Sequence, residues 1–348
     1  MSSSGRLLSR WAIKSDHRRR RFGGARMKRI LPLALLFAAT SLSSVAQAAE
    51  PSLFGYREMC NASAAAALDK DHFVVADDEL NVLRVYRRNE AASIAQVDLS
   101  SFLGTKPSKE SDIEGAARVG NLIFWISSHG TNRRGEVQDR RRRFFATEVV
   151  ERPSPTVRTI GKPYAKLVED LAGDRGLASY NLAEAATRPP KASDALNIEG
   201  LADGGDGSLL IGFRNPLPGG KALVVPLLNP TELIAGTPAR FGAPVELDLA
   251  GRGVRSIERV GSSFLIVAGP IDQEGAFELY AWPGPATDKV APVPTKALAG
   301  LFPEALIAIP DAQEIQILSD DGKAPVGGKT CEKQPRDQQA FRSVVFKP

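Results

Sequence analysis

Short apolar segments recur along the chain from residue 52 onward, and Gly, Pro, Asp and Asn separate them. The segments are rich in Val, Ile, Leu and Phe, and few show the 3.6-residue period of an amphipathic helix. This pattern is typical of many short β-strands joined by tight turns. The sequence predicts strands in five groups: 63–68, 72–77, 82–87 and 94–99; 113–119, 122–127, 144–150 and 156–160; 198–202, 208–213, 222–227 and 245–249; 255–260, 264–267, 277–281 and 290–293; and 304–309, 314–318 and 342–346.

A short motif opens the groups. Asn197-Ile198-Glu199-Gly200 stands before one apolar run, and Asp112-Ile113-Glu114-Gly115 and Ser256-Ile257-Glu258-Arg259 stand before two others. Fainter copies are Asn61-Ala62-Ser63-Ala64 and Pro303-Glu304-Ala305-Leu306. Groups of four antiparallel strands that repeat about every 45–60 residues indicate a β-propeller. We therefore predict an all-β protein, a single propeller domain over residues 49–348 with five four-stranded antiparallel blades.

Two irregularities refine this prediction. The fifth group has only three strands, and the segment 53–59 can supply its fourth, which would place both chain ends in one blade and leave no open sheet edge. The interval between Glu114 and Glu199 is longer than the others and contains a helical pattern. It predicts a short helical insertion around 164–187, and a degenerate sixth blade is the alternative.

The first 48 residues have the layout of a secretory signal peptide. A basic stretch ends at Met27-Lys28-Arg29, an apolar run follows over 30–39, and small residues stand at Ala46 and Ala48. Because the basic stretch is long, translation from Met27 is an alternative start. The apolar run is shorter than the roughly 20 residues that a membrane-spanning helix needs. We therefore expect a periplasmic or secreted protein with no membrane span after cleavage.

The formal charge of +5 comes from the presequence. The whole chain has 45 basic and 40 acidic residues; taking away the ten and one in residues 1–48 leaves 35 and 39, a net charge of −4. A mildly acidic mature protein has no electrostatic basis for nucleic-acid binding. We also expect the protein to be a monomer.

The two cysteines, Cys60 and Cys331, lie near opposite ends of the mature chain. Disulfides persist in exported proteins, and the shared blade would bring these residues near each other. We predict a disulfide between them; two unrelated buried thiols are the alternative.

The first strand of each propeller blade lines the central axis, so the repeated motif predicts a ring of side chains there. Aligning the motifs places Glu114, Glu199, Glu258 and Glu304 at equivalent positions, with Ser63 in the first group and Asp112 two residues before Glu114. Converging carboxylates repel one another unless a cation, a raised pKa or cationic partners relieve the repulsion. Carboxylate oxygens suit Ca²⁺ or Mg²⁺, so these five acidic residues are candidate metal ligands, with Ca²⁺ as the candidate cofactor. The alternatives are that the glutamates accept backbone hydrogen bonds from the next blade, or that Glu114 or Glu199 acts in acid–base catalysis.

Polar residues where the second strands end predict a pocket mouth at the same rim. The candidate binders of a small or anionic ligand are Asp77, Asp78, His129, Arg214, Asn215 and Arg255. His129 is also a candidate general base. Asp and Asn commonly cap tight turns, so turn formation is the alternative role of the acidic residues. An Arg-rich loop over 133–143 is either a solvated hairpin or a rim that attracts anions.

Several enzyme classes lack their motifs here. The chain has no Gly-rich phosphate loop, no G-x-S-x-G, no H-E-x-x-H and no C-x-x-C. The mature chain has two histidines, His72 and His129, which excludes a His-rich transition-metal site.

The motifs of the first three groups, with the run Val74-Val75-Ala76-Asp77-Asp78-Glu79, resemble those of the DUF3616 family over essentially the whole mature chain. This resemblance implies an exported bacterial propeller without an assigned activity. The motifs are also distantly similar to those of phytase-like and esterase-like propellers, which implies a Ca²⁺-dependent phosphoesterase as a second hypothesis. The fourth and fifth groups lack the motif glycine, and few cations stand near the ring. We therefore expect first a propeller that binds a small ligand or divalent cation at its axis and rim; a protein-interaction platform is the third hypothesis.

Overall fold

The computed structural model describes residues 52–151, 153–272 and 275–348, which lie in one compact unit that extends from Ala49 to Pro348. The predicted signal peptide, residues 1–48, lies outside the described residues. No helix in the described ranges is long and apolar enough to cross a membrane.

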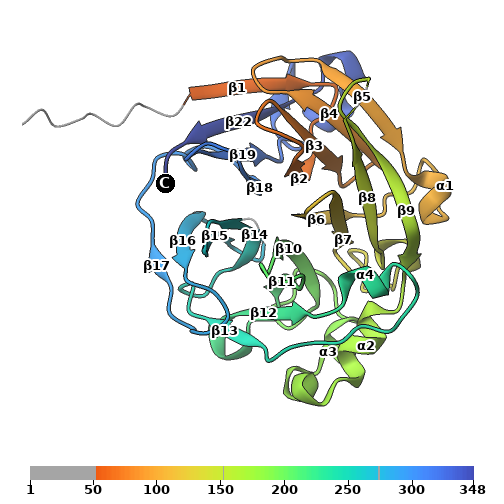
Figure 1. The fold of residues 1–348 in the computed structure, drawn as a ribbon, viewed down its shortest axis with the longest axis vertical. Coiled ribbons are helices and arrows are strands. Elements are labelled where there is room, and N and C mark those ends of the chain that lie inside the picture. The colour runs from red at the N-terminus through yellow and green to blue at the C-terminus, as the bar shows by residue number, and fades with distance from the viewer. Residues whose placement is uncertain (1–51, 152, 273–274) are drawn as a thin grey trace, which may run out of the picture. The chain divides into compact units, whose positions relative to one another are not determined.

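Five four-stranded antiparallel sheets surround a central axis, as the sequence predicts (Figure 1). The first four are made of consecutive strands. They are β2 (Ala62–Ala67), β3 (His72–Asp77), β4 (Val82–Arg87) and β5 (Ser93–Asp98); β6 (Ile113–Val119), β7 (Leu122–Ser127), β8 (Phe144–Val150) and β9 (Thr156–Tyr164); β10 (Asn197–Asp203), β11 (Leu209–Asn215), β12 (Ala222–Leu227) and β13 (Val245–Leu247); and β14 (Gly253–Val260), β15 (Ser263–Gly269), β16 (Glu278–Trp282) and β17 (Ala291–Pro292).

The fifth sheet joins the two ends of the described chain. Its strands are β18 (Pro303–Ala308), β19 (Ile315–Ser319), β22 (Ala340–Phe346) and β1 (Ser52–Arg57). β1 pairs with β22, from Ser52 opposite Val345 to Arg57 opposite Ala340. This pairing confirms that the N-terminal segment completes the fifth blade, and Figure 1 shows β1 beside β22 on the outside of the sheet.

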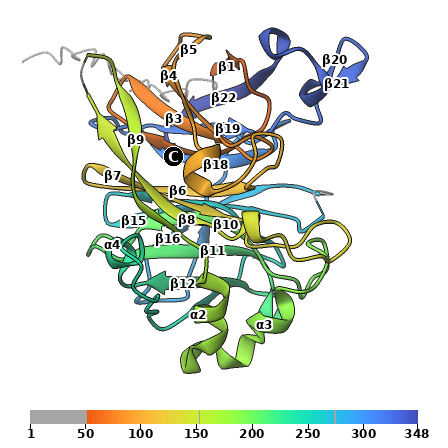
Figure 2. The same cartoon turned by 90° about the vertical axis from the view of Figure 1, so that its right-hand side faces the viewer.

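The long interval forms helices, not a sixth blade. It contains α2 (Leu167–Gly173), the 3₁₀ helix η2 (Arg175–Tyr180) and α3 (Leu182–Ala185). Leu167, Leu171 and Leu182 pack in one cluster with Phe213 and Leu223 of the third sheet, and Figure 2 shows α2 and α3 beside that sheet. The helices thus extend the core between the second and third sheets.

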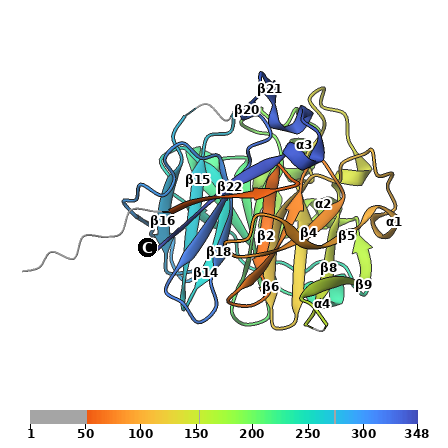
Figure 3. The same ribbon diagram turned by 90° about the horizontal axis from the view of Figure 1, so that it is seen from above.

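The remaining elements are short. They are α1 (Ser100–Leu103), α4 (Pro230–Leu233), β20 (Pro325–Val326), β21 (Lys329–Thr330) and the 3₁₀ helices η1 (Asp139–Arg141), η3 (Pro218–Gly220), η4 (Cys331–Lys333) and η5 (Arg336–Gln338). β20 and β21 form a two-stranded sheet that projects from one end of the propeller (Figure 3).

The apolar core consists of five clusters, one between each pair of neighbouring sheets. For example, Leu83 and Val85 of β4 pack with Trp125 of β7 and Phe145 of β8, and Tyr56 of β1 packs with Phe73 and Phe341. Because the clusters lie between sheets, the axis is left to the side chains of the inner strands β2, β6, β10, β14 and β18.

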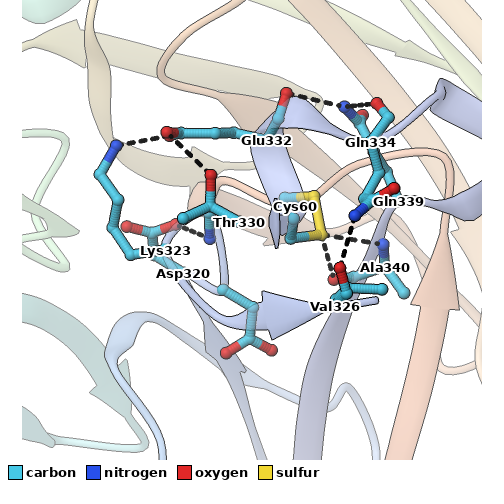
Figure 4. The surroundings of a disulfide bond; sticks show 12 residues. Cys60, Asp320, Lys323, Val326, Thr330, Glu332, Gln334, Gln339 and Ala340 are labelled. Carbon is cyan, nitrogen blue, oxygen red and sulfur yellow. Dashed lines mark hydrogen bonds and ion pairs between the residues drawn. A yellow bond between two sulfur atoms is a disulfide. The ribbon is translucent and has the colours of Figure 1, made fainter. Parts of the chain in front are cut away.

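The predicted disulfide is confirmed. Cys60 and Cys331 are bonded, with Cα atoms 6.0 Å apart across a sequence separation of 271 residues. Figure 4 shows the bond beside Ala340, whose backbone N–H contacts Cys331 Sγ at 3.4 Å. Both cysteines are buried. The bond fastens the start of the first blade to the excursion between β19 and β22.

The motif glycine of the third group has a packing role. A Cβ atom at Gly200 would lie 2.8 Å from Val254 Cγ1 and 2.9 Å from Ile257 Cγ2 on the neighbouring inner strand β14. Contacts this short force β-branched neighbours to move. Glycine at this position therefore allows β10 and β14 to approach closely.

Gly200→Ala is expected to lower the free energy of unfolding by about 1–3 kcal/mol, the usual effect of overpacking a well-packed core. Urea denaturation measures the change. Gly55→Ala in β1 is the control, because a Cβ atom there would have no neighbour within 4 Å. Equal effects of the two substitutions would contradict the packing role of Gly200.

Candidate functional site

Each inner strand contains one extra residue, a β-bulge, near its start. In β6, Ile113 pairs with Ser127 while Gly115 pairs with Ile126, so Glu114 has no partner of its own. The same irregularity places Glu199 at the bulge of β10. Bulges re-aim side chains and occur often near functional sites. A narrow cavity on the axis is lined by Glu114 and Glu199 together with residues of the other three inner strands.

The bulge in β14 corrects the predicted ring. It falls between Val254 and Ser256, so Arg255, and not Glu258, is the counterpart of Glu114 and Glu199. The bulges of β2 and β18 fall at Ser63 and Glu304, as predicted. The bulge ring is therefore Ser63, Glu114, Glu199, Arg255 and Glu304. Glu258 lies three residues further along β14, about 10 Å at the rise of an extended strand.

The sequence contains a signal for the correct alignment. Arg118-Val119-Gly120 and Arg259-Val260-Gly261 both stand at the turn after an inner strand. Counted back from these glycines, Glu114 and Arg255 occupy the same position, six residues earlier. Because Ser256-Ile257-Glu258 is similar to Asn197-Ile198-Glu199, an alignment of the motifs matches Glu258, and not Arg255, to Glu199.

Arg255 neutralises two glutamates of the bulge ring. Its Nε lies 2.9 Å from Glu199 Oε2, and its Nη2 pairs with Glu304. Arg214 Nη1 lies 2.6 Å from the other oxygen of Glu199. The side chain of Arg255 is 1% exposed; burial lowers its pKa, but the attraction of Glu199 and Glu304 outweighs burial and raises the pKa above its usual value. These ion pairs connect the inner strands of the third, fourth and fifth sheets.

The other side of the ring has three carboxylates, of which Asp112 alone pairs with an arginine in the described residues. Asp78 follows β3, Asp112 precedes β6 and Glu114 occupies the bulge, and their carboxylate oxygens lie within 4.8 Å of one another. Asp112 accepts a hydrogen bond from Ser128 Oγ, and Arg141 Nη1 lies 3.0 Å from Asp112 Oδ2. In the described chain no Arg or Lys pairs with Asp78 or Glu114, and Asp78 Oδ1 is buried without a hydrogen-bond partner. We call Asp78, Asp112 and Glu114 the carboxylate cluster.

Electrostatic repulsion acts on this cluster. Burial, followed by the charges of Asp320, Asp77 and Glu304, raises the pKa of Asp78 well above its usual range. Burial, followed by Asp112 and Glu199, does the same to the pKa of Glu114. Three arginines, Arg141, Arg214 and Arg255, pair with acidic groups of this region, which comprise Asp78, Asp112, Glu114, Glu199, Glu304 and Asp320. Carboxylates therefore outnumber arginines at this end of the axis, which we call the bulge end.

In the described residues no member of the carboxylate cluster is a hydrogen-bond partner of His129. Its side chain is 0% exposed, and its Nδ1 lies 2.7 Å from the carbonyl oxygen of Ser127. Burial lowers the pKa of His129 to about 4, and the charges that act on it are those of Arg142 and Arg143. It lines neither axial cavity, so the geometry gives no support to a general-base role.

Three other predicted ligand residues have structural contacts. Asp77 Oδ1 accepts the backbone N–H groups of Glu79 and Leu80, which is turn capping, and burial raises its pKa to about 7. Asn215 Nδ2 donates to the carbonyls of Pro190 and Ala192, and Arg214 Nη2 donates to Pro190. Arg214 and Asn215 thus fasten the segment before β10 and support Glu199.

Arg141 is a residue of this region that no motif in the sequence singles out. The Arg-rich loop was predicted either to be solvated or to attract anions, but Arg141 pairs with both Glu110 and Asp112 at 3.0 Å. Only the folded loop shows that one of its four consecutive arginines reaches the carboxylate cluster.

Comparisons with known proteins support the predicted family. Residues 61–152 and 152–303 match the profile of a family described as "Protein of unknown function (DUF3616)". A search of curated protein sequences finds no significant match.

Solved structures show distant similarity. Glutaminyl cyclase of Myxococcus xanthus is 11% identical, with 86% of this chain and 99% of that chain covered and a TM-score of 0.41. The PQQ-bound aldose sugar dehydrogenase of Streptomyces coelicolor is 12% identical, with 85% and 99% covered and a TM-score of 0.41. The GH43_1 enzyme of Xanthomonas citri complexed with xylose is 10% identical, with 84% and 89% covered and a TM-score of 0.44.

Proposed function

Because the chain belongs to the DUF3616 family, whose description assigns no activity, we propose from the geometry of the axis that it is an exported binding protein that holds a divalent cation, Ca²⁺, at the carboxylate cluster. The observation that carries the proposal is the convergence of Asp78, Asp112 and Glu114, whose oxygens lie within 4.8 Å of one another. A cation among them would offset the burial and the mutual repulsion that together raise the pKa values of Asp78 and Glu114.

The ligand chemistry favours calcium. Ca²⁺ takes six to eight oxygen ligands and accepts flexible geometries, and sites in extracellular modules bind it with dissociation constants of about 10⁻⁴–10⁻³ M. The cluster offers carboxylate oxygens only, with no His or Cys among its members. Asp112 is already oriented by Ser128 and Arg141, which leaves the free oxygens of Asp78 and Glu114 as the principal ligands and water as the remainder.

Export is supported by the disulfide, since such bonds persist in oxidising compartments. Calcium is compatible with this location because the affinity expected of such a site suits millimolar concentrations. We therefore place the proposed calcium site in a periplasmic or secreted protein.

The contacts support binding better than hydrolysis of phosphate esters. A phosphate group near the cation is commonly held by guanidinium or ammonium groups that are free to pair with it. Arg255 pairs with Glu199 and Glu304, and Arg214 pairs with Glu199. Both arginines are therefore already paired with glutamates. At the bulge end the carboxylates also outnumber the cationic side chains.

Calcium is expected to raise the melting temperature of EDTA-treated protein. A ligand at 100 times its dissociation constant stabilises the native state by about 2.7 kcal/mol. Differential scanning calorimetry with and without CaCl₂ measures this shift, and Glu114→Gln with Asp78→Asn should abolish it. Glu258→Gln is the matched control, because it makes the same chemical change away from the cluster.

Other outcomes decide against the proposal. If CaCl₂ leaves the melting temperature unchanged and calorimetric titration detects no binding, the carboxylate cluster is not a calcium site. If the Glu114 and Asp78 variants respond to calcium as the unmodified protein does, the ion binds elsewhere.

A further inference from the structure

A second, larger cavity lies at the other end of the axis, which we call the hairpin end because the turns after the inner strands surround it. Its volume is about 520 Å³, within the range of small-molecule sites. All five inner strands or the segments that follow them contribute to its lining, and five of the lining residues are alanines. Ala65 and Ala116 line both cavities. The lining residues are Ala65, Ala66, Ala67, Ala116, Arg118, Gly120, Asp203, Glu258, Arg259, Gly261, Ala308 and Pro310.

Three of the four charged residues in this lining already have partners within the protein. Arg118 donates from Nε to the carbonyl of Gly120 at 2.9 Å and from Nη1 to the carbonyl of Ala67 at 2.9 Å. Arg259 Nη1 lies 3.1 Å from Asp203 Oδ2, and Asp203 Oδ1 accepts the N–H of Gly205. These contacts hold the rim of the cavity in place.

Glu258 is the exception. Its Oε1 accepts the backbone N–H of Ala308 at 3.1 Å, and no Arg, Lys or His pairs with it in the described ranges. This hydrogen bond connects β14 to β18. It is the structural role expected for the glutamates as an alternative, in which each accepts a backbone hydrogen bond from the next blade. The hydrogen bond occupies one oxygen of Glu258. No cationic side chain of the described residues pairs with this carboxylate, which lines the cavity.

We propose that the cavity at the hairpin end binds a small organic cation with a primary ammonium group, which pairs with Glu258. An ammonium donates three hydrogen bonds, and the alanine walls leave room for a short methylene chain. The lining has no aromatic ring, so it lacks the cage that recognises quaternary ammonium groups. A metal ion suits this cavity less well, because Asp203 is committed to Arg259 and Gly205. The proposal is independent of the calcium site, which lies at the opposite end of the axis.

Binding of an ammonium group is coupled to a proton. Burial, then the charge of Asp203, raises the pKa of Glu258 to about 8, with the Ala308 hydrogen bond acting in the opposite direction. The other charged groups that face the cavity are Arg118 of β6 and Arg259 of β14, while β2 and β18 contribute only alanines and Pro310. Near pH 7 the carboxyl is mostly protonated, and it must ionise to pair with the ammonium. Binding should therefore release nearly one proton at pH 7 and fewer as the pH rises above 8.

Calorimetric titration with 1,4-diaminobutane tests the proposal on the EDTA-treated mature protein. Titrations in two buffers with different ionisation enthalpies give the number of protons released. We expect Glu258→Gln to weaken binding by at least 10-fold and to abolish proton release, while Gln Oε1 can still accept the Ala308 hydrogen bond. Glu90→Gln, which makes the same chemical change in an exposed ion pair with Arg87, should bind the diamine as the unmodified protein does.

One uncharged probe and one bulky cation distinguish the contribution of charge to binding from that of shape and N–H donors. 1,4-Butanediol has the same chain without charge, and tetramethylammonium has charge without N–H donors; both are expected to bind at least 10-fold more weakly than the diamine. Ala67→Leu, which fills part of the cavity, should also weaken binding. The proposal is overturned if the diamine does not bind, if the diol binds equally well, or if Glu258→Gln leaves affinity and proton release unchanged.

Discussion

Arg255→Met is expected to lower the free energy of unfolding by about 3–5 kcal/mol, which is the usual effect of removing one partner of a buried ion pair. Arg255 is 1% exposed and holds Glu199 and Glu304. Methionine fills similar space but leaves Glu304 without its arginine and Glu199 with Arg214 alone. The free energy of unfolding can be measured in urea at pH 7.

Two control variants separate the buried charge from other effects of this substitution. Arg158→Met removes the partner of Glu148 in a pair whose arginine is 70% exposed, and it should cost less than about 1 kcal/mol. Adding Glu304→Gln to Arg255→Met should recover part of the loss, because Glu304 is then no longer an unpaired buried charge while Glu199 keeps Arg214. If Arg255→Met costs no more than Arg158→Met, Arg255 does not hold the inner strands together.

Cys60→Ala with Cys331→Ala is expected to lower the free energy of unfolding by about 4 kcal/mol, within the range measured when native disulfides are removed. The bond spans a sequence separation of 271 residues, so its loss greatly enlarges the unfolded ensemble in chain-entropy models. For a protein of this size the melting temperature should fall by roughly 10 °C.

The matched control is the unmodified protein unfolded and refolded in a reductant, which should melt at the temperature of the double variant. Mass spectrometry after alkylation without reduction provides the chemical check. Two alkylated thiols in the protein as isolated would show that the bond is not formed, and an unchanged melting temperature in the variant would show that it does not stabilise the fold.

Much of the fold could be predicted from local pattern. Runs such as Phe73–Ala76 and Leu209–Phe213 are long enough to be strands and are bounded by turn residues, so their number and order predicted five blades, with a sixth as the alternative that the helices of the long interval replace. The helical insertion around 164–187 was recognised because Leu167, Val168 and Leu171 follow a helical period. β9 extends to Tyr164, beyond its predicted end at 160, because pairing with β8 continues past the apolar stretch.

The candidate site was predicted only in part. The sequence placed Glu114, Glu199 and Glu304 on the axis, and in the structure all three stand at bulges and line one narrow cavity. It assigned Glu258 to the same ring because a tetrapeptide motif cannot distinguish the bulge residue from a position three residues later. Asp78 and Arg141 are far from Glu114 in sequence. Whether they lie near Glu114 depends on where β3 ends and on the conformation of the loop after β7.

The sequence by itself determined the repeat, the strands of each blade and the presence of acidic residues near the axis, because these depend on local hydrophobic periodicity and turn residues. Only the tertiary structure decided which charges meet. Arg255 cancels Glu199 and Glu304, whereas Asp78, Asp112 and Glu114 are left together and Glu258 faces a separate cavity. The physical reason is that a single bulged residue sets which side chain of a strand points to the axis, and electrostatic interactions at a few ångströms depend on that register.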